Sequence, residues 1–379
     1  MLTAEGCSAR RQRLWDALSD KPDWVLIADP AGLMYFANFW ASPFVFRSAE
    51  APAMLLMSRD GRSVLVADNV QSAFAEKAFV DERVTPAWYR GTESAPHRGG
   101  LMVRAALERL ARSPGVAFGI GASSVPAGVI EGLRSQWSGV RFLDVDDVVR
   151  RLRRAKDADE VDLLLRTMRA AEAGQAAAMR GITPGMSELD AFRLIQSASV
   201  QAAGEPAWVY GDFASGAEPR GGGPGNRVIA AGDLFLLDYS VVLYHYRCDF
   251  ANTFVVGGKP TDRQRELSAA CLQAMAAGEK LLQPGTPCAE IDRAVRAVFE
   301  SRGLGGTFPH HTGHGLGLGH PEPPYLVPQS TDTLIVGDVV TIEPGQYVPG
   351  VGGMRFERNY LITAGGYEVL SRHTIGLQG

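Results

Sequence analysis

A pattern of helix, Pro-Gly turn and second helix occurs twice in the later part of the chain, and this repetition restricts the fold more than any other feature. Apolar residues recur at helical spacing from Val161 to Ala171, before the turn sequence GITPGMSELD at 181–190. The same order returns where LSAACLQAMAAGEKLL at 267–282 leads into QPGTPCAEIDRAVRAVF at 283–299. Acidic residues open the second helix of each unit, as is typical of helix N-termini. We interpret the repetition as a sign of two related halves.

Two strands follow each pair of helices, and each strand carries a carboxylate flanked by apolar residues. The strands are predicted at 233–239, 246–256, 338–344 and 354–363, and their carboxylates are Asp238, Asp249, Glu343 and Glu357. The first hairpin can bring both of its aspartates to one face of a sheet. Acidic side chains are rarely buried without a partner. Either each carboxylate has its own Arg or Lys partner or faces water, or all four converge with a histidine on two divalent cations.

Four of the seven histidines lie in HHTGHGLGLGHPEP at 310–323, among glycines that allow close backbone approach. They could be metal ligands, acid–base groups or polar loop residues. Two divalent cations would balance the charge of four carboxylates and make a water between them easier to ionise. One imidazole with several oxygen ligands suits manganese, cobalt or iron, whereas zinc more often takes additional nitrogen or sulfur.

The first part of the chain alternates short apolar runs with amphipathic segments, which predicts an α/β domain. Strands are predicted at 24–28, 33–37, 53–57, 63–67 and 116–121, and helices at 101–113 and 129–137. No chemical motif is visible in this part. A basic run at 148–160 leads into the first of the repeated helices, so we predict two domains, 1–150 and 151–379.

Composition limits the compartment and the kinds of partner. Hydrophobic residues make up 46% and charged residues 21% of the chain, as in soluble globular proteins. The net charge of −4 does not indicate nucleic acid or an anionic membrane as a partner, and no apolar run is long enough to cross a bilayer. The N-terminal segment lacks the apolar stretch of a secretory signal, and the four cysteines show neither metal-binding nor dense disulfide spacing. We therefore expect a cytoplasmic protein.

Three segments together resemble the pita-bread metallopeptidases, in the branch of Xaa-Pro aminopeptidases, prolidases and creatinase. They are LLDYSVVLYHYRCDFANTF, HHTGHGLGLG and TIEPGQYVPGVGGMRFERNYLIT. The family's metal-ligand positions correspond to Asp238, Asp249, His314, Glu343 and Glu357. The resemblance extends to the whole chain. It implies a fold of the α/β plus α+β class, with a creatinase-like N-terminal domain at 1–150 and a pita-bread catalytic domain of pseudo-two-fold symmetry at 151–379.

The resemblance also implies roles for residues around the metals. Glu343 would carry a proton from the attacking water to the leaving nitrogen as well as bind metal. His310 and His320 would steady the oxyanion. His320 stands six residues after His314, where the family pattern has seven.

For two neighbouring residues, the expected role is less specific. Arg355 would either brace the carboxylate of Glu357 or form an ordinary structural salt bridge. His311 is expected to face away from the site.

One histidine of the family pattern is missing. It normally precedes the first ligand strand, and the segment SGAEPRGGGPGNRVIAAGD has Gly221 or Arg220 at that place. The Gly-rich stretch 219–226 is therefore expected to be a loop reshaped for another substrate. Further departures, at Ser240, Ala251, Asn252 and Arg358, leave the ligands intact and alter the contacts around them.

The resemblance implies a hydrolase that cleaves the amide bond before proline in a short peptide, through a hydroxide that bridges two divalent metal ions. Manganese is the first expectation for the metal, with cobalt, iron and zinc as alternatives. A second hypothesis is hydrolysis or elimination at a C–N or amide bond of a non-peptide metabolite. Metal-free creatinase-like chemistry and a non-catalytic binding module both conflict with the complete ligand set. The family further implies a homodimer that acts on a peptide or another small amide, without nucleic acid or membrane as a partner.

Overall fold

The computed structural model describes residues 1–48, 51–218 and 220–378, and these residues form two compact units. The first unit is Met1–Arg153, and the second begins at Arg154. Each unit has its own sheets and its own buried apolar core. Among the described residues, no helix combines the length and the apolar character that a membrane span requires.

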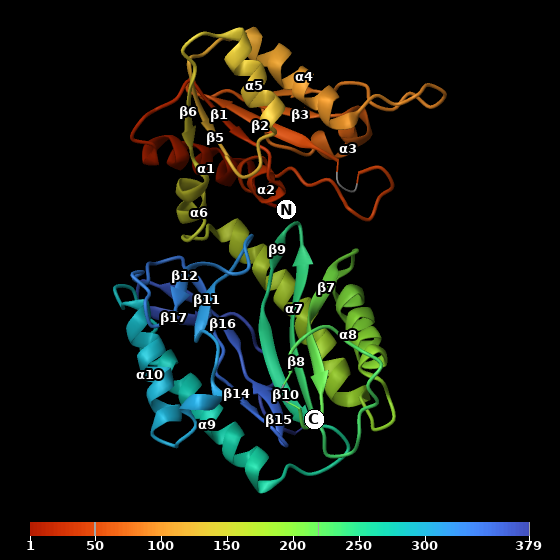
Figure 1. Ribbon diagram of the computed structural model, residues 1–379, viewed down its shortest axis with the longest axis vertical. Helices are drawn as coiled ribbons and strands as arrows, with labels where there is room; N and C mark the ends of the chain where they lie inside the picture. The colour runs from red at the N-terminus through yellow and green to blue at the C-terminus, as the bar shows by residue number, and fades with distance from the viewer. Residues whose placement is uncertain (49–50, 219, 379) are drawn as a thin grey trace. The chain divides into compact units, whose positions relative to one another are not determined.

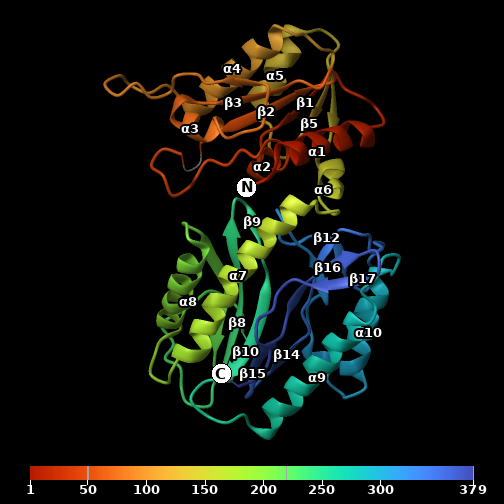
Figure 2. The same ribbon diagram turned by 180° about the vertical axis from the view of Figure 1, so that it is seen from behind.

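The first unit is built on one six-stranded sheet (Figures 1 and 2). Its strands are β1 (Trp24–Ile27), β2 (Ala53–Ser58), β3 (Ser63–Ala67), β4 (Glu82–Val84), β5 (Ala117–Ile120) and β6 (Arg141–Asp144), in the order β4-β3-β2-β1-β5-β6. Its helices are α1 (Ala4–Ala17), α2 (Pro30–Ala37), α3 (Ser72–Ala75), α4 (Arg98–Ala111), α5 (Ala127–Gln136) and α6 (Asp146–Leu152), with a 3₁₀ turn at Asn69–Gln71. Strand β1 is parallel to β5 and antiparallel to β2. Helices α4 and α5 cover one face of the sheet, and α1 and α2 lie on the other.

The strand predicted at 33–37 is wrong, because these residues belong to helix α2. Pro30 occupies the first turn, and the side chain of Asp29 accepts a hydrogen bond from the Gly32 N–H at 2.7 Å. Asn38 ends the helix in the left-handed conformation. These capping residues start and stop a helix around an apolar run that, taken by itself, favours a strand.

The second unit contains three sheets and four longer helices. The helices are α7 (Ala158–Gly181), α8 (Glu188–Ala203), α9 (Asp262–Glu279) and α10 (Cys288–Glu300), with a 3₁₀ turn at Gly305–Thr307. The first sheet has the order β10 (Phe250–Val255), β8 (Leu234–Leu243), β7 (Trp208–Ser215), with β9 (Tyr246–Arg247) paired to β8. The second has the order β12 (Glu322–Leu326), β11 (Gly313–Gly315), β13 (Val339–Ile342), β16 (Arg358–Thr363), β17 (Gly366–Val369). The third pairs β14 (Gly345–Val348) with β15 (Gly352–Arg355).

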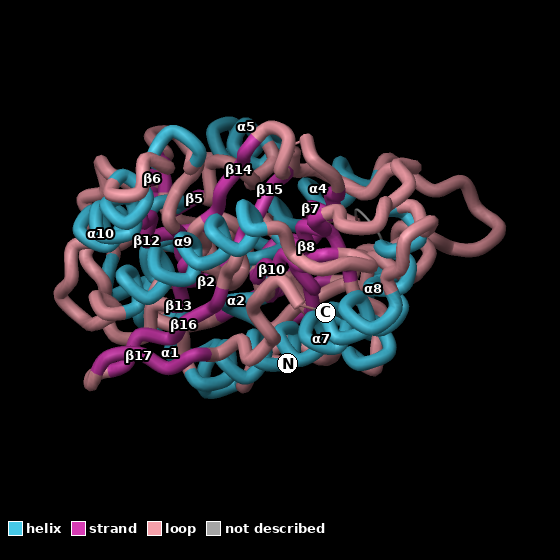
Figure 3. Tube along the Cα trace, turned by 90° about the horizontal axis from the view of Figure 1, so that it is seen from below, coloured by secondary structure: helices cyan, strands magenta, loops and turns pink. Residues whose placement is uncertain are grey.

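Within this unit the helices lie outside and the strands inside. Helices α7 and α8 pack against β8 and β7, and α9 and α10 pack against strands of the second half. Viewed from below, strands β8, β10, β14 and β15 lie between the two helix pairs (Figure 3). The apolar faces of the four helices therefore cover a layer of strands from two sides.

The two halves of the second unit repeat their local contacts as well as their elements. The N–H of Gly185 donates to the carbonyl of Ile229 at 2.9 Å, and the N–H of Gly285 donates to that of Leu334 at 2.8 Å. Both glycines have φ near +90° (96° and 89°), which suits the turn between their helices. Farther along each half, the side chains of Asp233 and Asp338 each accept a hydrogen bond from the backbone N–H three residues earlier, at 2.8 Å. By this correspondence, Asp238 in the first half and Glu343 in the second occupy equivalent positions.

The predicted strands at 246–256 and 354–363 are each interrupted once. The first divides into β9 and β10 at Cys248 and Asp249, and the second divides into β15 and β16 at Phe356 and Glu357. Contacts between the halves replace strand pairing at these breaks. The Glu357 N–H donates to the Ala251 carbonyl at 3.0 Å, and the Asp249 N–H donates to the Asn359 side chain at 3.2 Å. The interruptions therefore lie at two of the predicted ligands.

Candidate metal centre

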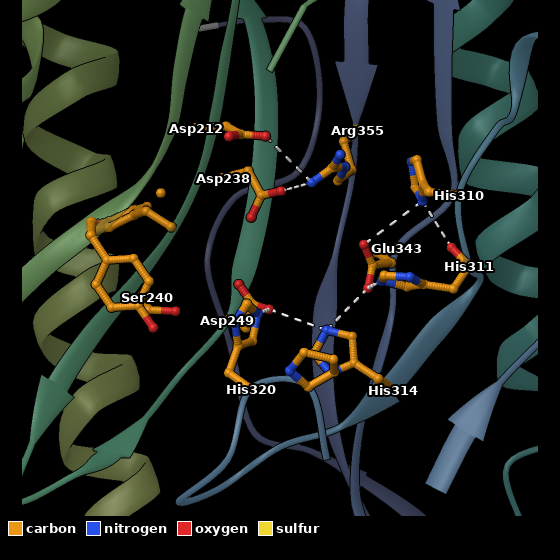
Figure 4. Close-up of a pocket in the computed structure, with 14 residues that line it drawn as sticks. Asp212, Asp238, Ser240, Asp249, His310, His311, His314, His320, Glu343 and Arg355 are labelled. Atoms are coloured by element: carbon orange, nitrogen blue, oxygen red, sulfur yellow. Dashed lines mark hydrogen bonds and ion pairs between the residues drawn. The ribbon is translucent and has the colours of Figure 1, made fainter. Parts of the chain in front are cut away.

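A pocket in the second unit collects most of the residues singled out in the sequence (Figure 4). Its walls are formed by Tyr210, Gly211, Asp212, Asp238, Tyr239, Ser240, Asp249, His310, His311, His314, His320, Pro321, Glu343 and Arg355. Both halves contribute, since the aspartates lie on or next to strands of the first sheet, whereas the histidines and Glu343 come from β11, the loops around it and the end of β13. The pocket therefore lies where the two halves meet.

Three groups of side chains within this region have geometry suited to a cation. One contains only oxygen donors, from Asp238, Asp249 and Glu357. A second is formed by Asp249, His314 and His320, and a third by His311, His314 and Glu343. Within each group the potential ligand atoms lie within 4.8 Å of one another. The structure thus brings all five predicted ligands together and adds His311 and His320.

The charge and burial of these carboxylates fit positively charged ligands. Asp238, Asp249, Glu343 and Glu357 are each at most 7% exposed. One oxygen of Glu357, Oε1, is buried and has no hydrogen-bond partner among the described residues. Burial, together with the charges of Asp249 and Glu343, raises the pKa of Glu357 well above its ordinary value. A cation at the oxygen-only group would satisfy this oxygen and offset the repulsion.

His314 is oriented as a metal-binding imidazole should be. Its Nδ1 lies 2.9 Å from the Gly315 carbonyl, which leaves Nε2 directed at Asp249 and Glu343, each 3.4 Å away. Burial would lower the pKa of His314, but the hydrogen bond to Asp249 and the charge of Glu343 raise it to about 9. A Cβ on Gly313 would stand 2.1 Å from the Thr341 carbonyl, so only glycine permits this close strand contact.

Neighbouring polar groups hold the two central carboxylates in place. The side-chain amide of Asn359 contacts both the N–H and the carbonyl of Asp249. The Thr341 hydroxyl donates to Glu343 Oε1 at 3.1 Å. Such contacts to the predicted ligand residues would fix their orientation before an ion binds.

His310 and Arg355 are joined through a residue that the sequence did not indicate. Arg355 Nε donates to the Tyr347 hydroxyl at 2.8 Å, and this hydroxyl lies 3.1 Å from His310 Nε2. His310 Nδ1 lies 2.8 Å from the His311 carbonyl, so both ring nitrogens are engaged. Arg355 contacts Asp238 through Nη1, and its charge also acts on Glu357, against the rise in the pKa of that carboxyl.

The expectation that His311 faces away from the site is wrong. Its Nε2 lies 3.1 Å from Glu343 Oε1, and its ring is 5.2 Å from that of His314. On the other side of His314, His320 Nε2 lies 2.6 Å from Asp249 Oδ2. Three imidazoles therefore alternate with two carboxylates along one wall (Figure 4). His311 lies next to His310 in a short loop, where no helical or strand periodicity indicates the direction of a side chain.

Asp212 lies near the place of the missing histidine. A Cβ on Gly221 would lie 2.5 Å from Asp212 Oδ2, so a larger side chain at 221 and the present position of Asp212 exclude each other. Pro219, the first residue of the predicted loop, lies outside the described residues. Of the other departures, Ser240 lines the pocket, whereas the Asn252 amide binds the backbone of Gly376. Asp212 was not predicted from the sequence as a site residue, although it, too, is a carboxylate within a strand.

Two family models match the chain over most of its length. That of metallopeptidase family M24 matches residues 162–364, and that of the creatinase/prolidase N-terminal domain matches residues 10–155. An Xaa-Pro dipeptidase of Pyrococcus horikoshii is 33% identical over 253 residues, which cover 66% of this chain and 72% of that protein. An uncharacterized peptidase of Staphylococcus aureus is 28% identical over 366 residues, 94% of this chain and 96% of that protein.

Solved structures agree with these matches. The prolidase of Pyrococcus horikoshii has a TM-score of 0.82 at 25% identity, covering 97% of this chain and 99% of that one. The prolidase of Pyrococcus furiosus has a TM-score of 0.77 at 26% identity, covering 93% and 97%. The resemblance found in the sequence and the predicted fold class, a creatinase-like domain followed by a pita-bread domain, are confirmed.

Proposed function

The chain belongs to metallopeptidase family M24, and from that membership we propose that it hydrolyses the amide bond before proline in a short peptide, with two divalent cations. The supporting observation is the convergence of four buried carboxylates and His314 from both halves, one carboxylate oxygen being buried without a partner. The dipeptidase and prolidases among the relatives are named for this bond. The enzyme class, a metal-dependent hydrolase, follows from family membership itself.

The residues present suit the cations that the proposal requires. Asp238, Asp249, His314, Glu343 and Glu357 would hold them. When bound, the cations supply a water of lowered pKa and polarise the substrate carbonyl. Manganese suits the oxygen-rich donor set, and cobalt, iron and zinc are the alternatives.

The chain's own residues supply proton transfer and charge stabilisation. Burial would raise the pKa of Glu343, but the hydrogen bond from His311 and the charge of His314 lower it, so Glu343 is an ionised carboxylate. It would take the proton of the attacking water and pass it to the leaving nitrogen. His320 and His310 would donate to the oxyanion. For His310, this requires that substrate replace one of its present contacts.

Metal content and cleavage should be measured together. Plasma mass spectrometry gives the ions bound per chain, and Gly-Pro, Ala-Pro and Xaa-Pro-Xaa peptides with added Mn²⁺ test the reaction. We expect close to two ions per chain and release of the residue before proline. A chain that binds no divalent ion under any condition would remove the basis for the proposal.

A second candidate function rests on the altered pocket wall. In place of the missing histidine, Gly221 has no side chain, and the carboxylate of Asp212 occupies the adjacent position. The same ligand set could then act by hydrolysis or elimination on a C–N or amide bond of a non-peptide metabolite. Bound metal without Xaa-Pro cleavage would favour this function, and a screen of small amides would identify the substrate class.

Two further parts of the proposal concern assembly and compartment. We propose a homodimer, which sedimentation velocity of the purified chain would test. A cytoplasmic location can be checked by fractionating the source cells.

Replacing His311 by alanine is expected to weaken binding of one cation roughly tenfold to a hundredfold, because the ring either ligates the ion or orients Glu343. Isothermal titration of the metal-depleted chain with Mn²⁺ and with Zn²⁺ measures this, and the effect should be larger for zinc. His97→Ala, which removes an exposed histidine of the first unit, is the control. Identical isotherms for both variants would contradict a role for His311.

A further inference from the structure

Asp212 is a pocket carboxylate outside the three candidate ligand groups. It lies on β7 directly opposite Asp238 on β8, so both side chains leave the same face of the sheet. Strand order in this sheet is β10-β8-β7, which places Asp212 one strand farther than Asp238 from β10, the strand that follows Asp249. Neighbouring strands are about 4.8 Å apart. Asp212 therefore stands at the outer side of the candidate metal centre.

The glycine-rich loop holds this carboxylate through a backbone hydrogen bond. The Gly222 N–H donates to Asp212 Oδ1 at 2.7 Å. The loop is fixed from behind by the fully buried Glu188, which accepts the Gly225 N–H at 3.2 Å and contacts Arg220. Because Gly221 has no side chain, Asp212 Oδ2 keeps its place in the pocket. The loop thus forms a wall around a defined negative charge.

Within the described residues, Asp212 shares its cationic partner with Asp238. Arg355 Nη1 is 3.9 Å from Asp212 Oδ2 and is in closer contact with Asp238 (Figure 4). The Asp212 side chain is 30% exposed, whereas that of Arg355 is 16% exposed. An ionised carboxylate in this position can attract a cation that arrives with the substrate.

An aromatic ring lies beside this carboxylate. Tyr210 stands two residues earlier on β7, so its side chain leaves the same face of the strand, and it also lines the pocket. Its hydroxyl accepts a hydrogen bond from Arg247 at 2.8 Å, which fixes the ring. A carboxylate next to a fixed aromatic face suits an ammonium or guanidinium group.

We propose that Asp212 determines substrate specificity by binding a positively charged side chain, so that substrates with a lysine- or arginine-like group before the scissile bond are preferred. The inference rests on the proposed cleavage of Xaa-Pro bonds and names the substrate class of that reaction. The α-ammonium of a peptide lies close to its scissile carbonyl. A group reaching Asp212, at the outer side of the centre, must extend farther, as a long side chain does.

The test compares Lys-Pro with norleucine-Pro, which has the same four-carbon side chain without the terminal ammonium group. In the intact chain, kcat/KM should be higher for Lys-Pro. Asp212→Asn keeps an oxygen that can accept the Gly222 N–H and removes the charge. It should lower kcat/KM for Lys-Pro roughly tenfold or more, as expected for a lost charge-assisted hydrogen bond, and leave norleucine-Pro within about twofold. Glu218→Gln removes an exposed charge from the same segment and serves as the matched control.

Several outcomes would overturn the inference. Equal losses on both peptides would mean that Asp212 acts by positioning Arg355 or by binding the α-ammonium. The absence of any preference for Lys-Pro in the intact chain would also exclude it, while leaving Xaa-Pro cleavage intact.

A binding measurement separates this inference from the proposed function. Isothermal titration of the metal-loaded chain with L-lysinamide and L-norleucinamide needs no cleavage. Tighter binding of lysinamide that Asp212→Asn abolishes would support the role of Asp212 even if no Xaa-Pro peptide were cleaved. Equal binding of both amides, together with no cleavage, would overturn both proposals.

Discussion

Replacing Asp249 by asparagine is expected to remove at least one bound cation per chain and to lower kcat/KM roughly a thousandfold, or about 4 kcal/mol of transition-state stabilisation. Asp249 has the largest effect because it belongs to both the oxygen-only group and the group with His314 and His320. Asparagine keeps the shape of the side chain and the backbone contacts to Asn359. Plasma mass spectrometry and the Xaa-Pro cleavage assay measure the two losses.

The control for this substitution must remove a carboxylate without touching the centre. Asp262→Asn does so, because that side chain is fully exposed at the start of α9. Its metal content and rate should match those of the unmodified chain. If Asp249→Asn retained two ions per chain, the assignment of Asp249 as a shared ligand would be wrong.

Replacing Lys156 by methionine is expected to destabilise the second unit by about 3–5 kcal/mol, because it leaves Glu322 buried without its charge partner. Lys156 Nζ lies 2.7 Å from Glu322 Oε1, and the two side chains are 1% and 5% exposed. Urea unfolding followed by tryptophan fluorescence and circular dichroism measures the change. The second oxygen of Glu322 accepts the Gly319 N–H at 3.0 Å, so the loop before His320 should also loosen.

Two further variants test whether the loss of stability comes from the buried ion pair. The double variant Lys156→Met with Glu322→Gln removes both charges and should recover a large part of the loss. Arg263→Met breaks an exposed pair on α9 and should cost less than about 1 kcal/mol. A loss of similar size in Lys156→Met and Arg263→Met would show that the buried pair contributes no more than a surface pair.

The features that sequence analysis located best were those with a strong local signal. A carboxylate inside an apolar strand led to Asp238, Asp249, Glu343 and Glu357, and the repeated Pro-Gly turn led to the two halves. The helix at Pro30–Ala37 was missed because its capping residues outweigh the strand propensity of its apolar run. The capping residues of this segment favour a helix, whereas its apolar and aromatic residues favour a strand. The second signal alone gave the wrong element.

The parts that sequence analysis missed depend on contacts between distant segments. Tyr347 joins the site through two contacts of its hydroxyl, one with Arg355 on a strand and one with His310 in a separate loop. His311 turns toward Glu343 in a loop whose direction no periodicity reveals. Asp212 is also a carboxylate within a strand, but Tyr210 and Gly211, directly before it, interrupt the apolar run that marked the other carboxylates.

The pairing of equivalent positions in the two halves has a thermodynamic consequence. Of the five proposed ligands, the first half supplies Asp238 and Asp249, and the second supplies His314, Glu343 and Glu357, so neither half alone offers the full proposed set. Cations held by both halves stabilise their association by the same free energy that the association contributes to ion binding. Separation of the halves releases the ions, and loss of the ions makes separation easier. Metal loading therefore makes the duplicated halves unfold cooperatively, as a single unit.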